Sequence, residues 1–277
     1  MSEIPISIKE NMIKDYNNGM SVRAVSIKYN YSYDKTRREF KKQNIKIRGN
    51  DFNSKKYKNN SNVFDEIDTE EKAYWLGFLY ADGCIINHCN NLVLSLALSE
   101  KDYNHLVLFQ CFLETDKPIH TYSGNHNNKY CRLVITDRHL CNELIEKGCF
   151  QRKTGKVTFP KFLPNELIRH FIRGYVDGNG CITYHMCGKN KNRFAFAIKI
   201  DSTKEMLYEF NKFLPVKNKK DIPTLGKRRK NEVNDYSLEF GGNKQTLNIL
   251  NYLYNDSNIY LQRKYDKYLL LKNMYSQ

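Results

Sequence analysis

Two oxygen-bearing side chains, those of Asp82 and Asn179, occupy the same place in a pattern that the chain contains twice. The copies cover residues 74–85 and 171–182, and in each the polar residue ends an apolar run and precedes a glycine. A carboxylate at the C-terminal end of a helix faces the negative end of the helix dipole, so stability alone does not favour Asp82 there. Because Mg²⁺ prefers oxygen ligands, two such side chains brought together could bind it.

Small residues four apart within each copy predict the helices that must position these side chains. They are Gly77 with Ala81 and Gly174 with Gly178. Residues i and i+4 share one face of a helix, and small side chains there let two backbones approach closely. Gly inside a helix costs about 1 kcal/mol relative to Ala, so these glycines favour a tight helix–helix interface. Gly83 and Gly180, which follow, are expected to end the helices in the left-handed conformation.

The two copies resemble the LAGLIDADG homing endonuclease family in its double-motif form. The matching segments are WLGFLYADG, residues 75–83, and IRGYVDGNG, residues 172–180. The resemblance implies that Asp82 and Asn179 hold a catalytic metal ion, Mg²⁺ with Mn²⁺ as a possible substitute. It also implies that the two motif helices form the central interface between two halves of the protein.

Asn179 departs from the family pattern because an amide lacks the negative charge of an aspartate. Asp177 lies two residues earlier, about 200° away around a helix, so it is a poor substitute. The alternative for Asp177 is a buried hydrogen-bonding role. The resemblance, together with a repeated Gln-Arg-Lys tripeptide, nominates Lys153 and Lys264 as catalytic residues that stabilise negative charge.

The charge of the chain indicates its partner. The formal net charge is +15 and the pI about 9.3, which makes nucleic acid the first expectation. No apolar run is long enough to span a membrane, and the N-terminus lacks the apolar segment of a signal peptide. The eight cysteines form no C-x-x-C pair, so we expect reduced thiols, no zinc site, and Cys84 and Cys181 in the strand core. We expect a monomer that is cytoplasmic or associated with the nucleoid and is not secreted.

The first 48 residues predict a small all-α domain with three helices in a helix-turn-helix layout. This segment resembles the resolvase-like helix-turn-helix class, and a three-helix protein-contact module is the alternative. Residues 49–64 are polar and basic and predict a linker. The third helix would be the recognition helix, with DNA-binding candidates Tyr33, Lys35, Thr36, Arg37 and Arg38.

The remainder of the chain predicts an α+β fold of two pseudo-symmetric halves, residues 65–160 and 161–277. Each half has the order α-β-β-α-β-β-α, and the resemblance implies that each presents a saddle-shaped antiparallel sheet to DNA. Basic residues on or beside the strands of the second half are candidates for phosphate and base contacts. These residues are Lys189, Lys191, Arg193, Lys227, Arg228, Arg229 and Lys230.

The resemblance implies a site-specific endonuclease that hydrolyses phosphodiester bonds in a long, asymmetric target of double-stranded DNA. With one carboxylate instead of two, three outcomes are open: cleavage of both strands, nicking of one, or binding alone. The alternatives on the same scaffold are a non-catalytic DNA-binding regulator and an RNA-binding cofactor of intron splicing. A duplicated packing helix without chemistry is a further alternative, but it leaves Asp82 unexplained.

Overall fold

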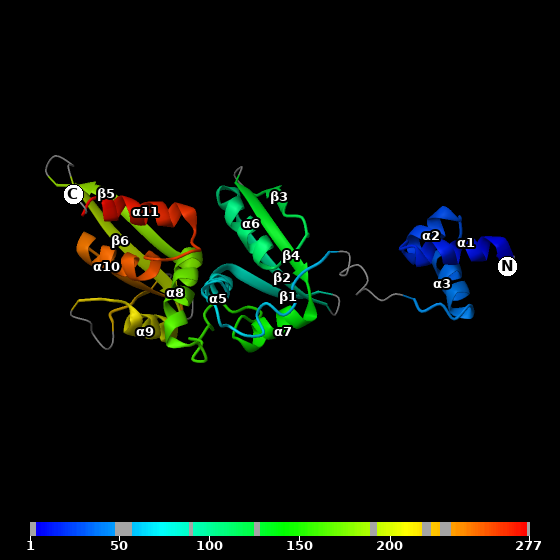
Figure 1. Ribbon diagram of the computed structural model, residues 1–277, viewed down its shortest axis with the longest axis horizontal. Helices are drawn as coiled ribbons and strands as arrows, with labels where there is room; N and C mark the ends of the chain where they lie inside the picture. The colour runs from blue at the N-terminus through cyan, green and yellow to red at the C-terminus, as the bar shows by residue number, and fades with distance from the viewer. Residues whose placement is uncertain are drawn as a thin grey trace. The chain divides into compact units, whose positions relative to one another are not determined.

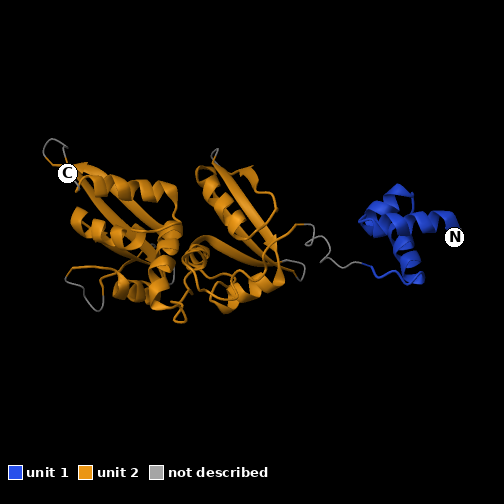
Figure 2. Ribbon diagram, viewed as in Figure 1, with its two compact units in different colours: residues 1–56 blue, residues 57–277 orange. Residues whose placement is uncertain are grey.

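The computed structural model describes residues 4–47, 57–88, 91–124, 128–188, 193–217, 223–227 and 234–275. The chain divides into two compact units, residues 1–56 and 57–277 (Figure 2). Residues 57–64, which the sequence places in a linker, belong to the larger unit and bury Val63 and Phe64 in its core. None of the described helices is long and apolar enough to cross a membrane.

The smaller unit is a bundle of three helices. Ser21 and Ser32 begin the second and third helices by accepting hydrogen bonds from the backbone N–H groups three residues on, the usual role of serine at this position. A small apolar core, which includes Met12, Val25 and Phe40, holds the bundle together. The helices are α1 (Ile6–Asn17), α2 (Val22–Lys28) and α3 (Tyr33–Lys42).

The larger unit begins with a half built around a four-stranded antiparallel sheet in the order β1-β2-β4-β3. Helices α6 and α7 pack on this sheet (Figure 1). The order of elements is the one that the sequence predicts. They are α5 (Glu70–Asp82), β1 (Gly83–His88), β2 (Asn91–Ser99), the short 3-10 helix η1 (Glu100–Asp102), α6 (Tyr103–Phe112), β3 (His120–Ser123), β4 (Lys129–Thr136) and α7 (Arg138–Glu146).

The second half repeats this order, with the sheet β5-β6-β8-β7 and helices α9 and α10 packed on it. The predicted α+β fold of two similar halves is therefore confirmed. A last helix, α11, is not anticipated by the sequence pattern. The elements are α8 (Asn165–Asn179), β5 (Gly180–Cys187), β6 (Arg193–Ser202), α9 (Lys204–Phe213), β7 (Gly226–Lys227), β8 (Tyr236–Gly241), α10 (Asn243–Tyr254) and α11 (Gln262–Asn273).

Each sheet has one face in the core and one open face. Side chains alternate between the faces along a strand, so cross-strand partners share a face. In the first sheet Ile85 and Leu94 face the core, whereas Cys84 lies on the open face. Cys181 is exposed in the same way at the start of β5, so the expectation that both cysteines belong to the strand core is wrong. Because each is the second residue of its strand, the alternation turns both away from the core.

The glycines that follow the two motif helices do not adopt the left-handed conformation. Gly83 has φ −66° and Gly180 has φ −96°, both with extended ψ. The chain passes directly from helix into strand at these positions, without an intervening turn. A side chain on Gly83 would meet the backbone and side chain of Leu79, and one on Gly180 would meet Val176. Glycine is needed here for space and not for its conformational freedom.

Candidate active site

The helices α5 and α8 pack side by side at the centre of the larger unit. A Cβ atom on Gly77 would overlap the carbonyl group of Phe171, and one on Gly174 would overlap that of Tyr74. The two backbones therefore approach as closely as the sequence predicts. Gly178 faces Ala81 in the same interface. This contact brings the C-terminal ends of both helices, with Asp82 and Asn179, to the same region of the protein.

Asp82 is the last residue of α5, and its side chain is exposed to solvent. Its carboxylate lies beside Gly178 of the other helix: a Cβ atom on that glycine would be 3.4 Å from Oδ2. The surrounding protein partly desolvates the carboxyl group and raises its pKa, while the positive charges of Lys264 and Lys153 act in the opposite direction. A carboxylate that solvent reaches, flanked by two cations, is available to a ligand.

Asn179 is bound into its own half. Its Nδ2 donates a hydrogen bond of 2.7 Å to the carbonyl oxygen of Asp201 in β6. The hydroxyl oxygen of Tyr175 lies 2.7 Å from Ser202 Oγ and 3.2 Å from the same carbonyl oxygen of Asp201. The two repeated positions therefore differ in their contacts: an amide tied to a strand in one half, an exposed carboxylate in the other.

Lys153 and Lys264 both donate hydrogen bonds to the carbonyl oxygen of the glycine that begins the following strand. Lys153 Nζ contacts the oxygen of Gly83. Lys264 Nζ donates to the carbonyl groups of Gly180, Val176 and Asp177 at 2.6–2.7 Å. Burial lowers the pKa of Lys264 to about 8, although nearby Asp177 favours its charged form. The residues that sequence nominates for charge stabilisation thus also hold the ends of the motif helices.

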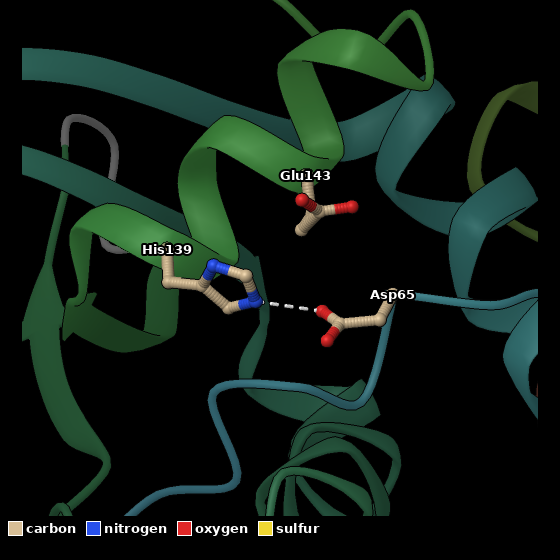
Figure 3. A group of neighbouring side chains, drawn as sticks. All are labelled: Asp65, His139 and Glu143. Atoms are coloured by element: carbon tan, nitrogen blue, oxygen red, sulfur yellow. Dashed lines mark hydrogen bonds and ion pairs between the residues drawn. The ribbon is translucent and has the colours of Figure 1, made fainter.

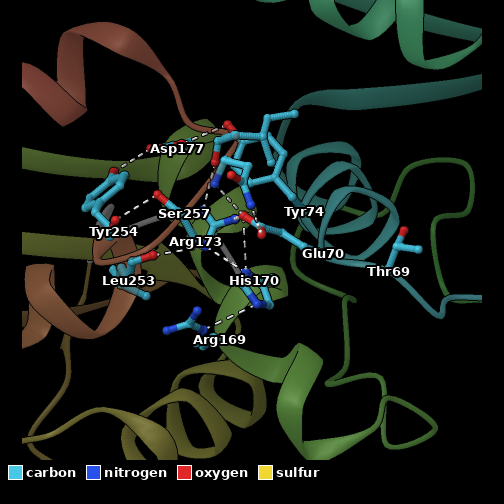
Figure 4. A network of polar contacts seen from close by, with 12 residues as sticks. Thr69, Glu70, Tyr74, Arg169, His170, Arg173, Asp177, Leu253, Tyr254 and Ser257 are labelled. Carbon is cyan, nitrogen blue, oxygen red and sulfur yellow. Dashed lines mark hydrogen bonds and ion pairs between the residues drawn. The ribbon is translucent and has the colours of Figure 1, made fainter.

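A buried polar network joins α8 to α5 and α10 (Figure 4). Asp177 is fully buried and accepts hydrogen bonds from the hydroxyl groups of Tyr74 and Tyr254 and from the backbone N–H of Leu261. The structure thus gives Asp177 the buried hydrogen-bonding role that the sequence leaves as the alternative. The Asp177 carboxylate is engaged in these buried hydrogen bonds and is separate from the exposed carboxylate of Asp82.

Arg173, one turn before Asp177 on α8, is also fully buried. Its guanidinium group binds Glu70 at 2.7 Å and the carbonyl groups of Leu253 and Ile259. Glu70 begins α5, so this ion pair joins the two halves (Figure 4). Arg173 and Glu70 are not among the site residues that the sequence predicts. A lone arginine within the apolar run of the second motif was the available signal, since a buried charge requires a partner.

A second interhalf ion pair lies beside Lys264. Arg263 Nε donates to both oxygens of Asp102 at 3.0 Å, and Asp102 precedes α6 in the first half. These residues line a cleft of about 490 Å³ between the two halves, together with His105. The Gln-Arg-Lys tripeptide thus has two structural tasks in the second half: one residue links the halves and the next holds the end of α8.

The DNA-binding candidates of the smaller unit divide by exposure. Tyr33, Arg37 and Arg38 are exposed on α3, and Lys35 is half-buried with its ammonium group over the ring of Tyr31. Thr36 is fully buried, so its side chain belongs to the core of the bundle. A shallow hollow of about 270 Å³ runs along the exposed face, lined by Asp34, Arg37, Arg38 and Lys41.

Only two of the basic candidates on the second sheet fall within the described residues. Arg193 begins β6 and Lys227 ends β7, and both are exposed. The others lie outside the described residues. They are Lys189, Lys191, Arg228, Arg229 and Lys230.

A further group of ligand-type side chains lies away from Asp82. Asp65, His139 and Glu143 each place an oxygen or nitrogen atom within 4.8 Å of the others (Figure 3). His139 Nε2 is 2.8 Å from Asp65, and Glu143 pairs with Lys147 at 2.8 Å. Asp65 raises the pKa of His139 through this hydrogen bond. Since each group already has a partner, the cluster serves as an ion-pair contact between the segment before α5 and helix α7.

No family model matches this chain, and no curated protein matches it. Its structure is similar to that of the I-LtrWI LAGLIDADG homing endonuclease bound to target DNA, with a TM-score of 0.50 and 14% identity over 79% of this chain and 92% of the other. The LAGLIDADG homing endonuclease I-GzeII, in complex with a DNA target, gives a TM-score of 0.49 and 10% identity over 73% and 88% of the two chains. At these identities the likeness to I-LtrWI establishes the fold. The chain therefore has the fold of the LAGLIDADG homing endonucleases.

Proposed function

We propose that this protein is a site-specific endonuclease that cleaves double-stranded DNA at a long, asymmetric target. The observation that carries the proposal is the exposed carboxylate of Asp82, at the C-terminal end of two closely packed helices and flanked by Lys153 and Lys264. A net charge of +15 favours a polyanionic substrate. The structural neighbours that share this fold are homing endonucleases solved with DNA, which supports the same assignment.

The residues at the helix ends fit a divalent metal ion in part. Asp82 offers a carboxylate, and no side chain among the described residues hydrogen-bonds to it. A hard cation such as Mg²⁺, or Mn²⁺ in its place, takes oxygen ligands of this kind. When bound, it supplies Lewis-acid activation of the phosphate and of the attacking water. Asp82 would hold it, with Asn179 Oδ1 as a weaker, neutral oxygen ligand, since it is Nδ2 of this amide that binds Asp201.

The lysines act on this site through position and charge. Lys264 and Lys153 place positive charge near Asp82, where negative charge accumulates on a phosphate during cleavage. Because the pKa of Lys264 is about 8, it is mostly protonated at neutral pH and loses its charge in alkaline solution. Their hydrogen bonds to the carbonyl groups of Gly83 and Gly180 hold the first residue of each strand next to the end of the preceding helix.

The difference between Asp82 and Asn179 favours nicking of one strand over cleavage of both. One side of the site has a free carboxylate, while the other has a neutral amide engaged with Asp201. Metal binding on the second side is therefore weaker. The neutral amide of Asn179 also favours a second candidate function, a DNA-binding regulator that does not cleave. A cleavage assay distinguishes the two functions.

The smaller unit would extend the target. Tyr33, Arg37 and Arg38 share the exposed side of α3, as expected for a helix that enters the major groove. In the larger unit, Arg193 is an exposed cation on the open face of the second sheet, suited to phosphate contacts, whereas Lys227 is exposed on the opposite face of its edge strand. We expect the smaller unit to contribute affinity and salt dependence and no chemistry.

The test is cleavage of supercoiled plasmid that carries the flanks of the gene rejoined without it, in Mg²⁺ and in EDTA. The matched variant is Asp82→Asn, which removes one charge without changing size. We expect nicked circles, which are lost in EDTA and reduced at least about 10²-fold in the variant, comparable to the loss of a main charge-stabilising group. Salt-sensitive binding without cleavage by the wild type would favour the regulator instead. Cleavage that persists in Asp82→Asn would overturn the assignment of the active site to Asp82.

A further inference from the structure

The open faces of the two sheets differ in chemistry. On the first sheet this face carries branched aliphatic and tyrosine side chains, and on the second it carries charges. The first set is Cys84, Ile86, Val93, Ser95, Ala97, Ser99, His120, Tyr122, Tyr130, Arg132, Val134 and Thr136. The second is Cys181, Thr183, His185, Cys187, Arg193, Ala195, Ala197, Lys199, Asp201, Gly226, Ser237, Glu239 and Gly241.

Three aliphatic side chains are contiguous on the first sheet. Ile86 lies directly opposite Val93 across β1 and β2, and Val134 of β4 is a diagonal neighbour of Val93. Ile86 is 41% exposed. Further along the same face Tyr122 and Tyr130 stack, with ring centroids 5.7 Å apart and an angle of 22° between the rings. Among the side chains described on this face, Arg132 alone carries a full charge.

The second sheet has no aliphatic side chain larger than alanine on the described part of its open face. Lys199 pairs with Asp201 at 3.6 Å, and Lys199 stands opposite Glu239 in the neighbouring strand. Arg193 adds a further cation at the start of β6. Such a surface offers charged donors and acceptors and no bulky aliphatic group among its described residues.

We propose that the open face of the first sheet, centred on Ile86, Val93 and Val134, reads thymine in its half of the DNA target through the C5-methyl group. The inference rests on the proposed function. In the major groove the thymine methyl is the apolar group that base edges present, and aliphatic side chains recognise it by contact. The face is continuous with the proposed active site, because β1 begins at the residue after Asp82. The charged second sheet reads its half by hydrogen bonds instead.

The composition of the first face favours DNA over a protein partner. Of the aliphatic side chains, Ile86 is exposed and Val93 and Val134 are half-buried, and Ser95, Thr136 and Arg132 interrupt them, so no wide apolar patch of the kind buried in stable dimers results. Arg132 stands opposite Ala97, close enough to the patch to contact a phosphate or a guanine edge beside a thymine. A net charge of +15 also brings the whole chain toward a polyanion.

The experiment uses the full-length protein and duplexes selected by binding from a randomised pool in Ca²⁺. In a selected duplex, each deoxythymidine is replaced by deoxyuridine, which removes the methyl group and leaves base pairing intact, first in one half and then in the other. We expect Kd to rise about fourfold for each methyl group buried against the patch, and only in one half. Ile86→Thr and Val134→Thr should lose this sensitivity, whereas Thr183→Val on the second sheet should keep it.

The outcomes separate the two proposals. If no duplex is retained, the proposed function fails and the thymine inference falls with it. If duplexes bind and deoxyuridine has no effect in either half, only the thymine inference is overturned. An equal loss of affinity for both forms of the duplex in Ile86→Thr would assign the patch a structural role. Self-association that the same variant abolishes, measured by sedimentation equilibrium, would make the face a protein interface and also overturn it.

Discussion

The two motif helices occupy equivalent places and are stabilised by different means. In α5, the residues from Ala73 to Tyr80 are all buried, and none of them is charged. In α8, the charged residues Arg173 and Asp177 are fully buried among mostly apolar buried side chains of the same helix. The position equivalent to Asp177 in the first helix is Tyr80, whose hydroxyl group donates to the carbonyl oxygen of Lys147. The buried charges along the helix pair therefore come from α8, whereas α5 contributes Glu70 at its first residue and the hydroxyl group of Tyr74 to the same network.

This difference extends to the helix ends. On the first side, Lys153 binds the carbonyl oxygen of Gly83, and Asp82 is exposed and without a hydrogen-bond partner among the described side chains. On the second side, Lys264 binds three carbonyl groups at the end of α8 while Asn179 binds Asp201. The second half is thus specialised for holding the structure together, and the first keeps the group that can act on a ligand.

The largest effect is expected for Asp177→Asn, which leaves the buried ammonium group of Lys264 without its nearest countercharge. Removal of one partner from a buried charged network costs about 3–5 kcal/mol of unfolding free energy. The equivalent change in the first half, Tyr80→Phe, removes one hydrogen bond and should cost only about 1 kcal/mol. Denaturant unfolding followed by the fluorescence of Trp75, the single tryptophan, reports on the larger unit alone. Equal costs would contradict the contrast between the helices.

A smaller effect is expected for Gly174→Ala, which tests the contact that both helices share. The new methyl group would overlap the carbonyl oxygen of Tyr74, so the helices must separate. Overpacking of this kind costs about 1–3 kcal/mol. Gly241→Ala is the matched control, because a Cβ atom there meets nothing within 4 Å, and its change should stay within about 0.5 kcal/mol. A stable Gly174→Ala protein would show that the interface is looser than described.

Acid should destabilise the larger unit through His105, which packs beside the helix pair in the first half. Burial lowers its pKa from 6.5 to about 3. Between these values the unfolded chain binds a proton that the folded chain does not, so stability falls as pH falls below 6.5. From pH 7 to pH 5 the loss is about 2 kcal/mol, and His105→Gln should remove it.

The control for this pH effect is His139, which is exposed and has the opposite behaviour. Its pKa is raised by Asp65, so its contribution is present at low pH and is lost as pH rises through the folded value. Because the pair is exposed, the effect should be under about 1 kcal/mol. Unfolding of His139→Gln and His105→Gln between pH 5 and pH 8 would therefore differ in sign, and the same sign for both would contradict the assignment.

The smallest expected effect, on activity, is that of Asn179→Asp, which restores a carboxylate to the second side. An aspartate cannot donate to the carbonyl group of Asp201, so the side chain should turn away from β6 toward the metal site. We expect the ratio of linear to nicked plasmid to rise about tenfold, the lower end of the effects seen for changes around metal ligands. An unchanged ratio would mean that the preference for nicking one strand arises from residues other than Asn179.

Much of the framework follows from local sequence. The repeated motif, the small residues at i and i+4, and the alternation of the strands predict two similar α+β halves that meet at a helix pair, and serine caps predict the starts of α2 and α3. These signals are local because each depends on residues within one helix or strand. The helix α11 carries no comparable apolar stripe, since most of its residues are polar or aromatic, and it was missed.

The prediction of a left-handed conformation at Gly83 and Gly180 was wrong because it considered only residues near each glycine along the chain. A glycine after a helix commonly supplies such a turn, but here the next residues pair at once in β1 and β5, which requires an extended backbone. The strand partner, many residues distant in sequence, decided the conformation.

Sequence alone predicted most of the elements other than α11, their order, the tight helix pair and the presence of one aspartate where its partner position has an asparagine. Only the tertiary structure decided what those residues touch. It placed Lys153 and Lys264 on backbone carbonyl groups, paired Arg173 with Glu70, and turned Asn179 toward β6. The physical reason is that local propensity depends on neighbours along the chain, whereas burial, ion pairing and desolvation depend on groups that folding brings together from distant positions.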